Sequence, residues 1–398
     1  MHGMREMEAL LKSILNRSEL ANLVQRMIRA DSCGIDGRYE KEVAQVLKTF
    51  FDENGIRSEI REIGNNRYNL VGQIKGRFPG KRILLTGHLD TVGDYGIPGL
   101  FDGKETDGII HGRGACDMKG PIGAMAYGMA MLKRAALLPD HDVEFAFVAD
   151  EEMRSLGTEK LIEDGLKADF AVLGEPTDMH ICVGNRGLEW LDVVIFGKGS
   201  HGGTSDQGIN AVDMASHFIT KVRKDYLPKL AQRRHEILGS STMNIGAIRG
   251  GFQASTVPEE CVISIDRRWI PGESTQQLYS EYEQLLEELA NEHEGFRGEV
   301  RRNLTGINKL EHVPFHIDRE HFSVRMLEEH IYRVKGEYPE KKAFQGWTDG
   351  SLLSHFGKIP TVIFGPGNIA DAHSKNEKIA VKDLEDAALI YGLTALKW

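Results

Sequence analysis

The sequence predicts an α/β protein with a mostly parallel sheet flanked by helices, interrupted along the chain by a smaller α+β domain. Helical and strand patterns alternate over residues 1–186, which is typical of crossover units in a parallel sheet. Residues 187–305 follow a different order of strands and helices, and residues 306–398 return to the first pattern. At 398 residues the chain is long enough for two domains. The first of these is therefore expected to be discontinuous.

Helical spacings and short apolar runs define the expected elements of the first domain. Helices are expected where apolar residues recur at helical spacing, and buried strands where apolar residues are continuous over a few positions. The expected helices cover residues 40–54, 122–135 and 323–334. The expected strands cover residues 82–86, 143–148, 169–173 and 360–364. Because such continuous strands are buried on both sides, helices are expected to cover both faces of the sheet.

From about Gly187 the pattern becomes that of a compact α+β unit. The expected strands cover residues 190–196, 243–248, 262–268 and 299–304, and the expected helices cover residues 211–222 and 275–294. Two helices among four strands is the composition of a split βαβ, ferredoxin-like unit. Residues 187–305 are therefore expected to form a second domain, inserted into a first domain made of residues 1–186 and 306–398.

Composition and charge exclude several classes of protein. A hydrophobic content of 41% and a charged content of 27% are ordinary for a globular protein. The net charge of -10 disfavours nucleic-acid binding, which needs a basic surface. We see no secretory signal, no apolar run of bilayer length and no CxxC pair among the four cysteines. These observations favour a cytoplasmic protein with reduced thiols that contacts neither nucleic acid nor membrane.

Histidines and carboxylates follow the ends of the expected strands. In an open parallel sheet, ligands bind beyond the carboxyl ends of the strands, so residues placed there gather at one edge. The residues in such positions, or in the loop before the 122–135 helix, are His88, Asp117, Glu151, Glu152, Glu175 and His373. Two histidines with three or four carboxylates form the ligand set of a paired zinc site.

Each of these residues has an ordinary alternative when taken alone. A histidine at a strand end is more often a hydrogen-bonded surface residue, and Asp117 could simply cap the helix that follows it. Glu151 and Glu152 could form a solvated acidic turn, although adjacent side chains point apart, so one could bind metal while the other faces substrate. Asp90 could accept the proton of the His88 nitrogen that does not bind metal. Only the joint placement on one edge favours a metal site.

The segments around these residues resemble a superfamily of two-zinc hydrolases. This superfamily includes acetylornithine deacetylase, succinyl-diaminopimelate desuccinylase, aminoacylase and a glutamate-releasing carboxypeptidase. The resemblance covers nearly the whole chain and is carried by residues 87–92 (GHLDTV), 112–120 (GRGACDMKG) and 372–377 (AHSKNE). It implies a zinc exopeptidase-like catalytic domain and an inserted ferredoxin-like domain that acts as a lid and dimerisation domain.

The resemblance also implies how the metals are held. His88 and Glu175 would bind one zinc ion, Glu152 and His373 would bind the other, and Asp117 would bridge both. Each subunit would hold two Zn²⁺ ions, although nitrogen and oxygen ligands of this kind also accept Co²⁺ or Mn²⁺. Members of the superfamily often have a cis peptide bond after the bridging aspartate.

The same resemblance implies a reaction and a substrate class. Glu151 would be the general base that takes a proton from the shared water and passes it to the leaving amine, with Asp90 in a supporting role. Glutamate at position 175 resembles the deacylases and carboxypeptidases of the superfamily. The chain is therefore expected to cleave the amide bond of an N-acyl amino acid. The alternative is a metallocarboxypeptidase or dipeptidase that acts on small peptides.

Further substrate contacts are implied in both domains. His201 resembles a histidine that a partner subunit presents to the oxyanion, which implies a homodimer through the inserted domain. Arg268 matches an arginine that holds the substrate carboxylate, a role suited to its forked donors. Ser255 stands where the superfamily commonly has an asparagine that helps to hold the substrate, so this departure leaves the substrate class open but not the chemistry. Thr348 and Gly350 resemble a turn that lines the pocket, with a plain turn as the alternative.

Other functions are less well supported by the sequence. Residues 197–203 contain GxGxxG, but no helix pattern opens directly after it, which disfavours a dinucleotide site. His312 and His316 have helical spacing, yet Pro314 between them breaks a helix, so they are dismissed as ligands. A non-catalytic relative is also possible, but such a protein would have no need of Glu151.

Overall fold

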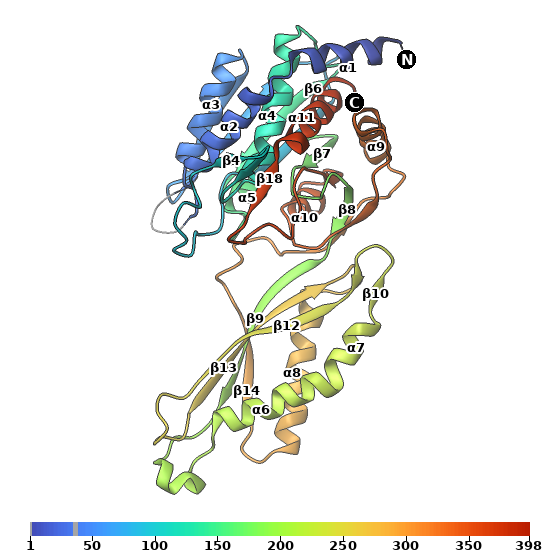
Figure 1. Cartoon of the computed structure of the whole chain (residues 1–398). Coiled ribbons are helices and arrows are strands. Elements are labelled where there is room, and N and C mark those ends of the chain that lie inside the picture. The colour runs from blue at the N-terminus through green and yellow to red at the C-terminus, as the bar shows by residue number, and fades with distance from the viewer. Residues whose placement is uncertain (1, 35–38) are drawn as a thin grey trace. The chain divides into compact units, whose positions relative to one another are not determined.

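The computed structural model describes residues 2–34 and 39–398, which form two units (Figure 1). One comprises Met1–Asn185 and His316–Trp398, and the other comprises Arg186–Phe315. The second unit thus extends beyond residue 305, where the sequence analysis ended the inserted domain. The reason is that the chain beyond this point stays bonded to the second unit, where the backbone N–H of Leu188 donates to the carbonyl of His312 over 2.8 Å.

The first unit is built on a nine-stranded mixed sheet whose centre is parallel. Its strand order is β1-β2-β6-β3-β7-β17-β8-β15, and β16 also pairs with β8. The neighbours β6, β3, β7 and β17 run parallel to one another, whereas β1 and β2 are antiparallel additions at one side. The strands are β1 (Arg57–Gly64), β2 (Arg67–Ile74), β3 (Arg82–His88), β6 (Asp142–Val148), β7 (Phe170–Leu173), β8 (Ile181–Asn185), β15 (Phe315–His316), β16 (Lys341–Phe344) and β17 (Thr361–Ile363).

Helices cover both faces of this sheet, as the continuous apolar strands predict. On one face Leu84 and Ala171 pack with Leu161 of α5 and Leu353 of α10. On the other face, the ring of Phe51 from α3 lies 4.5 Å from the ring of Phe145. The helices of this unit are α1 (His2–Ile14), α2 (Arg17–Arg29), α3 (Lys41–Glu53), α4 (Lys119–Arg134), α5 (Leu156–Glu163), α9 (Phe322–Lys335), α10 (Gly350–His355) and α11 (Val381–Leu396).

The sequence analysis missed several elements of the first unit. Helix α11 is apolar on almost every side and packs along α4, so it lacks the one-sided pattern that identifies a surface helix. The short strands β4 (Lys104–Thr106), β5 (Ile109–His111) and β18 (Lys378–Ala380) form a small separate sheet. Three-residue strands are too short for their periodicity to stand out.

The second unit has the ferredoxin-like architecture that its element order predicts. Its four-stranded antiparallel sheet has the order β12-β13-β9-β14. Alternate residues of its strands, such as Val193 and Ile263, pack with Phe218 of α6 and Tyr282 of α8. The main elements are β9 (Gly187–Phe196), α6 (Ala211–Lys221), β12 (Thr242–Gly250), β13 (Glu260–Trp269), α8 (Thr275–Glu292) and β14 (Arg297–Arg302). Smaller ones are α7 (Leu227–Gln232), β10 (Arg234–His235) and β11 (Gly239–Ser240).

Two sequence-level expectations concern the environment of the chain. The four cysteines are buried and form no disulfide bonds, namely Cys33, Cys116, Cys182 and Cys261. Among the helices in the described part of the chain, none is both long and apolar enough to cross a bilayer.

The buried His330 of α9 makes the stability of the fold depend on pH. Its side chain is 4% exposed and its Nδ1 lies 3.1 Å from Thr394 Oγ1. Burial, with a smaller effect of Arg333, lowers the pKa of His330 from 6.5 to about 4. Between these values the unfolded chain binds a proton that the folded chain does not, so stability falls as the pH falls.

We therefore expect wild type to lose about 2 kcal/mol more unfolding free energy between pH 7 and pH 5 than the His330→Gln variant loses. Urea unfolding at the two pH values, under the same metal conditions, measures the difference. His355→Gln, at an exposed position of α10, is the matched control and should behave like wild type. Equal losses in wild type and His330→Gln would contradict the prediction.

Candidate metal centre

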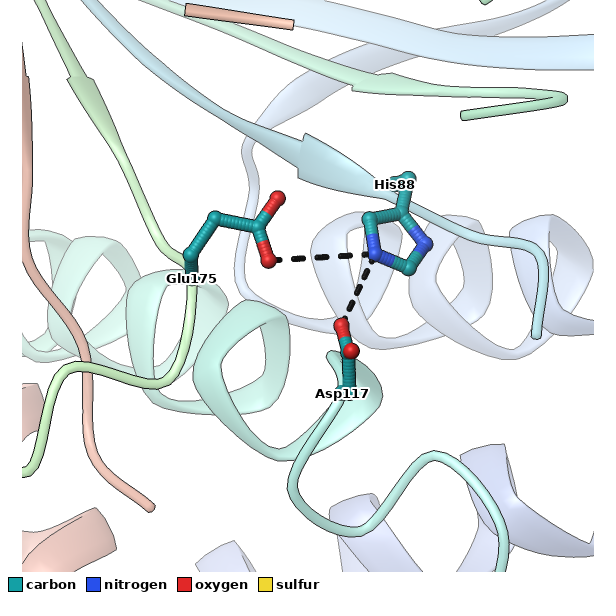
Figure 2. Close-up of side chains that lie close together, drawn as sticks. All are labelled: His88, Asp117 and Glu175. Carbon is teal, nitrogen blue, oxygen red and sulfur yellow. Dashed lines mark hydrogen bonds and ion pairs between the residues drawn. The ribbon is translucent and has the colours of Figure 1, made fainter. Parts of the chain in front are cut away.

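The parallel strands bring the predicted ligands to one edge of the first unit's sheet. His88 is the last residue of β3, Glu152 follows β6, Glu175 follows β7 and His373 lies in the loop after β17. These four strands are neighbours and parallel, so their carboxyl ends coincide. Asp117 reaches the same edge from the loop before α4 (Figure 2).

The ligands form two groups that share one residue. His88, Asp117 and Glu175 make up one group, and Asp117, Glu152 and His373 make up the other, with the ligand atoms of each within 4.8 Å of one another. Asp117 Oδ1 lies 3.0 Å from His88 Nε2, whereas Asp117 Oδ2 lies 3.4 Å from His373 Nε2. One carboxylate thus offers a different oxygen to each group. This is the geometry of a bridging ligand between two cations.

Each of the two ligand groups contains a glutamate in addition to its histidine and Asp117. Glu175 Oε2 lies 4.0 Å from His88 Nε2, as Figure 2 shows. Glu152 Oε1 lies 3.1 Å from His373 Nε2. Glu175 is 3% exposed, and its Oε1 has no hydrogen-bond partner among the described residues. A buried carboxylate oxygen without a partner is costly unless a cation binds it, so the residues fit a metal ion.

Electrostatics point to the same conclusion. Burial, followed by the repulsion of neighbouring carboxylates that include Asp117, raises the pKa of Glu175 well above its usual range. Burial likewise raises the pKa of Glu151 and of Glu152. Carboxylates packed this closely cannot all be ionised unless positive charge is added between them. Imidazole and carboxylate ligands suit Zn²⁺ and related divalent ions.

The two histidines and Asp117 respond in the opposite direction. Burial alone would lower the pKa of His88, but its contact with Asp117 and the nearby glutamates raise it well above its usual value. Contacts with Asp117 and Glu152 raise the pKa of His373 to about 11. Although burial would raise the pKa of Asp117, hydrogen bonds from both histidines lower it. Protonated histidines thus supply, in part, the positive charge that bound cations would provide.

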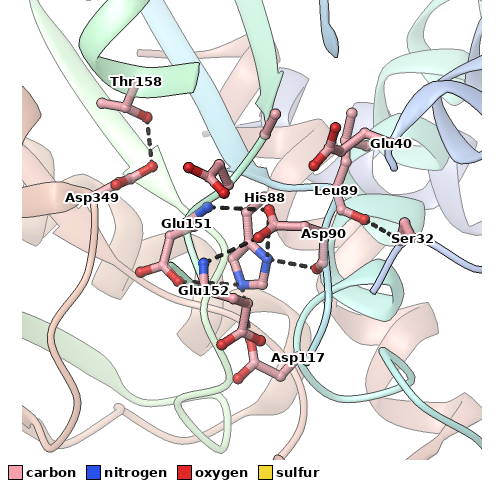
Figure 3. Close-up of polar contacts among 12 residues, drawn as sticks. Ser32, Glu40, His88, Leu89, Asp90, Asp117, Glu151, Glu152, Thr158 and Asp349 are labelled. Carbon is pink, nitrogen blue, oxygen red and sulfur yellow. Dashed lines mark hydrogen bonds and ion pairs between the residues drawn. The ribbon is translucent and has the colours of Figure 1, made fainter. Parts of the chain in front are cut away.

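Asp90 supports the centre differently from what the sequence analysis expected. The Nδ1 of His88 donates to the backbone carbonyl of Asp90 over 2.9 Å, whereas the Asp90 carboxylate lies 3.7 Å away. This carboxylate instead accepts the backbone N–H groups of Glu151 and Glu152, over 3.2 and 3.1 Å (Figure 3). The Asp90 carboxylate binds the loop rather than the ring because the loop after β6 places two N–H groups against it. Asp90 therefore positions the loop that carries Glu151.

A buried cation, missed by the sequence analysis, balances Asp90. Arg67 of β2 forms ion pairs with Glu40 and with Asp150, the latter over 2.7 Å. Its Nη2 also lies 3.9 Å from Asp90 Oδ2. No sequence motif indicates Arg67, because its partners are far apart in the chain. They lie at the start of α3, after the end of β3 and in the loop after β6.

Glu377 also contributes to the site, although the sequence analysis assigned it no role. Its Oε1 accepts the backbone N–H groups of Gly114, Cys116 and Asp117, over 2.9, 3.1 and 3.0 Å. Its Oε2 lies 2.5 Å from Arg113 Nη1. Glu377 therefore fixes the loop that presents Asp117 to both ligand groups. The Asp117-Met118 peptide bond in this loop is cis, as expected.

Glu151 and the Thr348 turn complete the surroundings of the centre. Glu151 Oε2 lies 4.0 Å from His88 Nε2, close to the first ligand group. Thr348 is buried, and its hydroxyl donates to Asn185 over 2.8 Å and accepts the Gly350 N–H over 3.2 Å. Between them in sequence, Asp349 accepts the hydroxyl of Thr158 over 2.5 Å, and burial raises its pKa to about 7 (Figure 3). The sequence analysis named this turn but not Asp349.

The other three predicted site residues belong to the second unit. His201 is exposed, and its Nδ1 accepts the N–H of Gly203 over 3.1 Å. Ser255 is on a neighbouring loop, and its carbonyl accepts the Gly202 N–H over 2.8 Å. Arg268 lies on β13 and pairs with Asp266 through Nε and Nη2, over 2.7 and 2.9 Å.

Comparison with known proteins identifies relatives over almost the whole length. Over 401 aligned residues, 27% are identical to the N-formyl-4-amino-5-aminomethyl-2-methylpyrimidine deformylase of Halalkalibacterium halodurans, covering 93% of this chain and 92% of that one. Over 330 residues, 31% are identical to the acetylornithine deacetylase of Myxococcus xanthus, covering 81% and 82% of the two chains.

Two solved structures with the same fold are peptidases by name. A tripeptidase of Staphylococcus aureus has a TM-score of 0.79 at 25% identity and covers 96% of this chain and 98% of that one. A dinuclear metal-binding peptidase of Bacillus subtilis has a TM-score of 0.69 at 17% identity, with coverage of 96% and 97%. At the lower identity the similarity concerns the fold alone.

The family model that matches is that of peptidase family M20/M25/M40, and the match runs over residues 84–397. This range includes both ligand groups, from His88 to His373. Since the match covers well over half of the chain, the protein belongs to peptidase family M20/M25/M40 and is a hydrolase.

Proposed function

We propose that the protein is a two-metal amidohydrolase that releases the acyl group from an N-acyl amino acid. The observation that carries this proposal is the bridging position of Asp117, which offers Oδ1 to the group of His88 and Oδ2 to the group of His373. The acyl-removing relatives, a deformylase and a deacetylase, support the release of an acyl group, and the acetylornithine deacetylase supports an amino-acid substrate.

The proposed metals are two Zn²⁺ ions per subunit, with Co²⁺ or Mn²⁺ able to substitute. His88 and Glu175 would hold one ion, Glu152 and His373 would hold the other, and Asp117 would bridge them. Ions held there supply Lewis-acid chemistry, which lowers the pKa of water towards neutrality and polarises an amide carbonyl. The two ligand groups that share Asp117 support the number of ions.

Glu151 is proposed as the general base. It takes a proton from the water whose oxygen adds to the amide carbon, and it returns that proton to the nitrogen as the C–N bond breaks. Glu151 Oε2 lies 4.0 Å from His88 Nε2, so this carboxylate is close to the first ligand group without belonging to it. Asp90 holds the backbone of the same loop, so it keeps Glu151 in place during both transfers.

The second unit supplies the remaining contacts in this proposal. Arg268 holds the carboxylate of the substrate, and Ser255 lies in the loop beside His201, where it helps to hold the substrate. His201 stabilises the oxyanion from the partner subunit, which makes the protein a homodimer through this unit. Thr348 and Gly350 contribute the substrate-facing turn of the first unit. The four buried thiols suit a reducing compartment, so a cytoplasmic location is part of the proposal.

A second candidate is a metallocarboxypeptidase or dipeptidase that acts on small peptides. The observation that favours it is the similarity to a tripeptidase at 25% identity over 96% of the chain. The two candidates use the same metal ligands and the same base, and they differ in whether an acyl group or an amino acid leaves on the carbonyl side.

Metal-stripped protein tests both candidates. We expect no turnover before metal is added and hydrolysis after addition of Zn²⁺ or Co²⁺, with N-formyl, N-acetyl or N-succinyl amino acids cleaved more efficiently than dipeptides. The measurement is kcat/KM for amine release across the panel. Higher kcat/KM values for the dipeptides would favour the second candidate, and failure to bind two ions per chain would contradict the metal assignment.

The Glu151→Gln variant tests the base. Because glutamine cannot take up the proton of the water, we expect kcat to fall by about 10²–10⁴-fold. Two metal ions per chain should remain bound, since Glu151 belongs to neither ligand group. Elemental analysis and steady-state kinetics measure the two effects. A variant that kept its activity would exclude Glu151 as the base.

The Glu377→Gln variant tests how Asp117 is positioned. An amide has one acceptor oxygen and no charge for Arg113, so the loop that carries Asp117 should loosen. We expect the apparent metal affinity to fall by about 10–100-fold. Competition with a chelator measures this affinity, and Glu329→Gln, on the surface of α9 with 46% of its side chain exposed, is the control. Unchanged affinity in Glu377→Gln would mean that the loop keeps its shape without this carboxylate.

A further inference from the structure

One face of the second unit's sheet carries a pair of arginines. Helices α6 and α8 pack against the apolar residues of the opposite face, including Val193 and Ile263 (Figure 1). Arg268 is directly opposite Leu188 of β9 in the antiparallel register. Arg186 lies just before β9, and its Nη1 reaches Oγ1 of Thr242, which is directly opposite Arg268 in the register of β12 with β13. Both arginines therefore belong to the helix-free face.

Thr242 connects the two arginines. Arg186 Nη1 donates to Thr242 Oγ1 and to the carbonyl of Ser240, each over 3.1 Å. In the register of β12 with β13, Thr242 is directly opposite Arg268. Directly opposed residues in an antiparallel pair have Cβ atoms about 4.5–5.5 Å apart. Arg186 and Arg268 thus flank the same threonine.

Asp266 sets the direction in which Arg268 presents its donors. It binds the Nε and Nη2 of Arg268 side-on, over 2.7 and 2.9 Å, and it accepts the indole N–H of Trp190 over 3.1 Å. A guanidinium has five N–H donors, and a side-on pair uses only two of them. The end-on pair formed by Nη1 and Nη2 therefore points away from Asp266. An end-on pair of this kind matches the two oxygens of a carboxylate.

The two guanidinium groups repel each other. Burial first, and then the positive charges of Arg268 and Arg267, lower the pKa of Arg186, whereas Asp266 acts in the opposite direction. Arg267 is on the other face of β13, where it pairs with Glu273 over 2.7 Å. A small anion that contacted both Arg186 and Arg268 would relieve this repulsion and gain a charged hydrogen bond to each.

We propose that Arg186 and Arg268 together form a two-arginine carboxylate site, in which Arg186 is a second substrate-binding residue. This inference rests on the proposed function, which assigns the substrate carboxylate to Arg268. It adds that substrate binding requires a free carboxylate next to the scissile amide, because both arginines contact that carboxylate. Substrates in which this carboxylate is replaced by a neutral carboxamide should be rejected, because the carboxamide lacks the charge and offers only one acceptor oxygen.

The test compares N-acetyl amino acids with their matched α-carboxamides. Binding to the metal-loaded Glu151→Gln protein, in which substrate stays intact, is measured by calorimetry. Turnover is measured with proteins that retain Glu151. We expect Arg186→Gln to weaken binding of the acids by about tenfold, or ~1.4 kcal/mol, and to change binding of the carboxamides little. In turnover, KM for the acids should rise while kcat changes little. Arg186→Lys, which keeps one charge, should lie between the two.

Two further variants make the test specific. Arg268→Gln combined with Arg186→Gln should weaken acid binding by less than the product of the single effects, because one carboxylate contacts both residues. Arg301→Gln removes a cation from β14 on the same helix-free face, opposite Asp192, and should leave the preference for acids unchanged. Circular dichroism of each variant establishes that it is folded.

The outcomes separate this inference from the proposed function. If the parent protein binds acids and carboxamides equally, or if Arg186→Gln and Arg186→Lys weaken both equally, the two-arginine site is wrong. If acids bind preferentially through Arg186 and yet no N-acyl amino acid is turned over by metal-loaded wild type, the site stands and the proposed deacylase function is wrong.

Discussion

The burial of four carboxylates against one another is the constraint on which the first unit depends. Glu151, Glu152 and Glu175 follow neighbouring strands, and Asp117 reaches the same edge from the loop before α4. Burial raises the pKa of each of the three glutamates, whereas contacts with His373 and His88 lower the pKa of Asp117. Isolated buried charges of one sign would oppose folding by several kcal/mol each. Two divalent cations at this position would remove the penalty and would supply Lewis-acid chemistry. Metal binding would then be coupled to the folding of this edge.

The ligands are held in place mainly through the backbone of their loops. Asp90 binds the N–H groups of the loop after β6, and Glu377 binds those of the loop before α4. Each carboxylate accepts several N–H groups at once, so one side chain fixes a whole loop. Arg67 and Arg113 balance the charges of Asp90 and Glu377, respectively. This arrangement keeps the ligand side chains themselves available for metal.

In the second unit, the register of the antiparallel strands determines where the charged side chains lie. Arg268 and Thr242 are opposed across β13 and β12, and Asp266 holds Arg268 from the same strand. A sheet with helices on one face has its other face available for polar chemistry. Strand register therefore decides which cations meet there, and a shift by one residue would turn Arg268 towards the helices.

The sequence by itself determined the fold class, because apolar runs and their periodicity report directly on burial. It also indicated the family, through the motifs at residues 87–92, 112–120 and 372–377. It also predicted the candidate metal ligands, because they lie at or beyond the ends of recognisable strands or shortly before a helix. Only the tertiary structure decided that Asp117 shares its two oxygens between two groups, that Asp90 binds a loop rather than the ring of His88, and that Glu377 holds the Asp117 loop. These contacts join residues far apart in the chain, whose meeting depends on strand order and loop path rather than on local pattern.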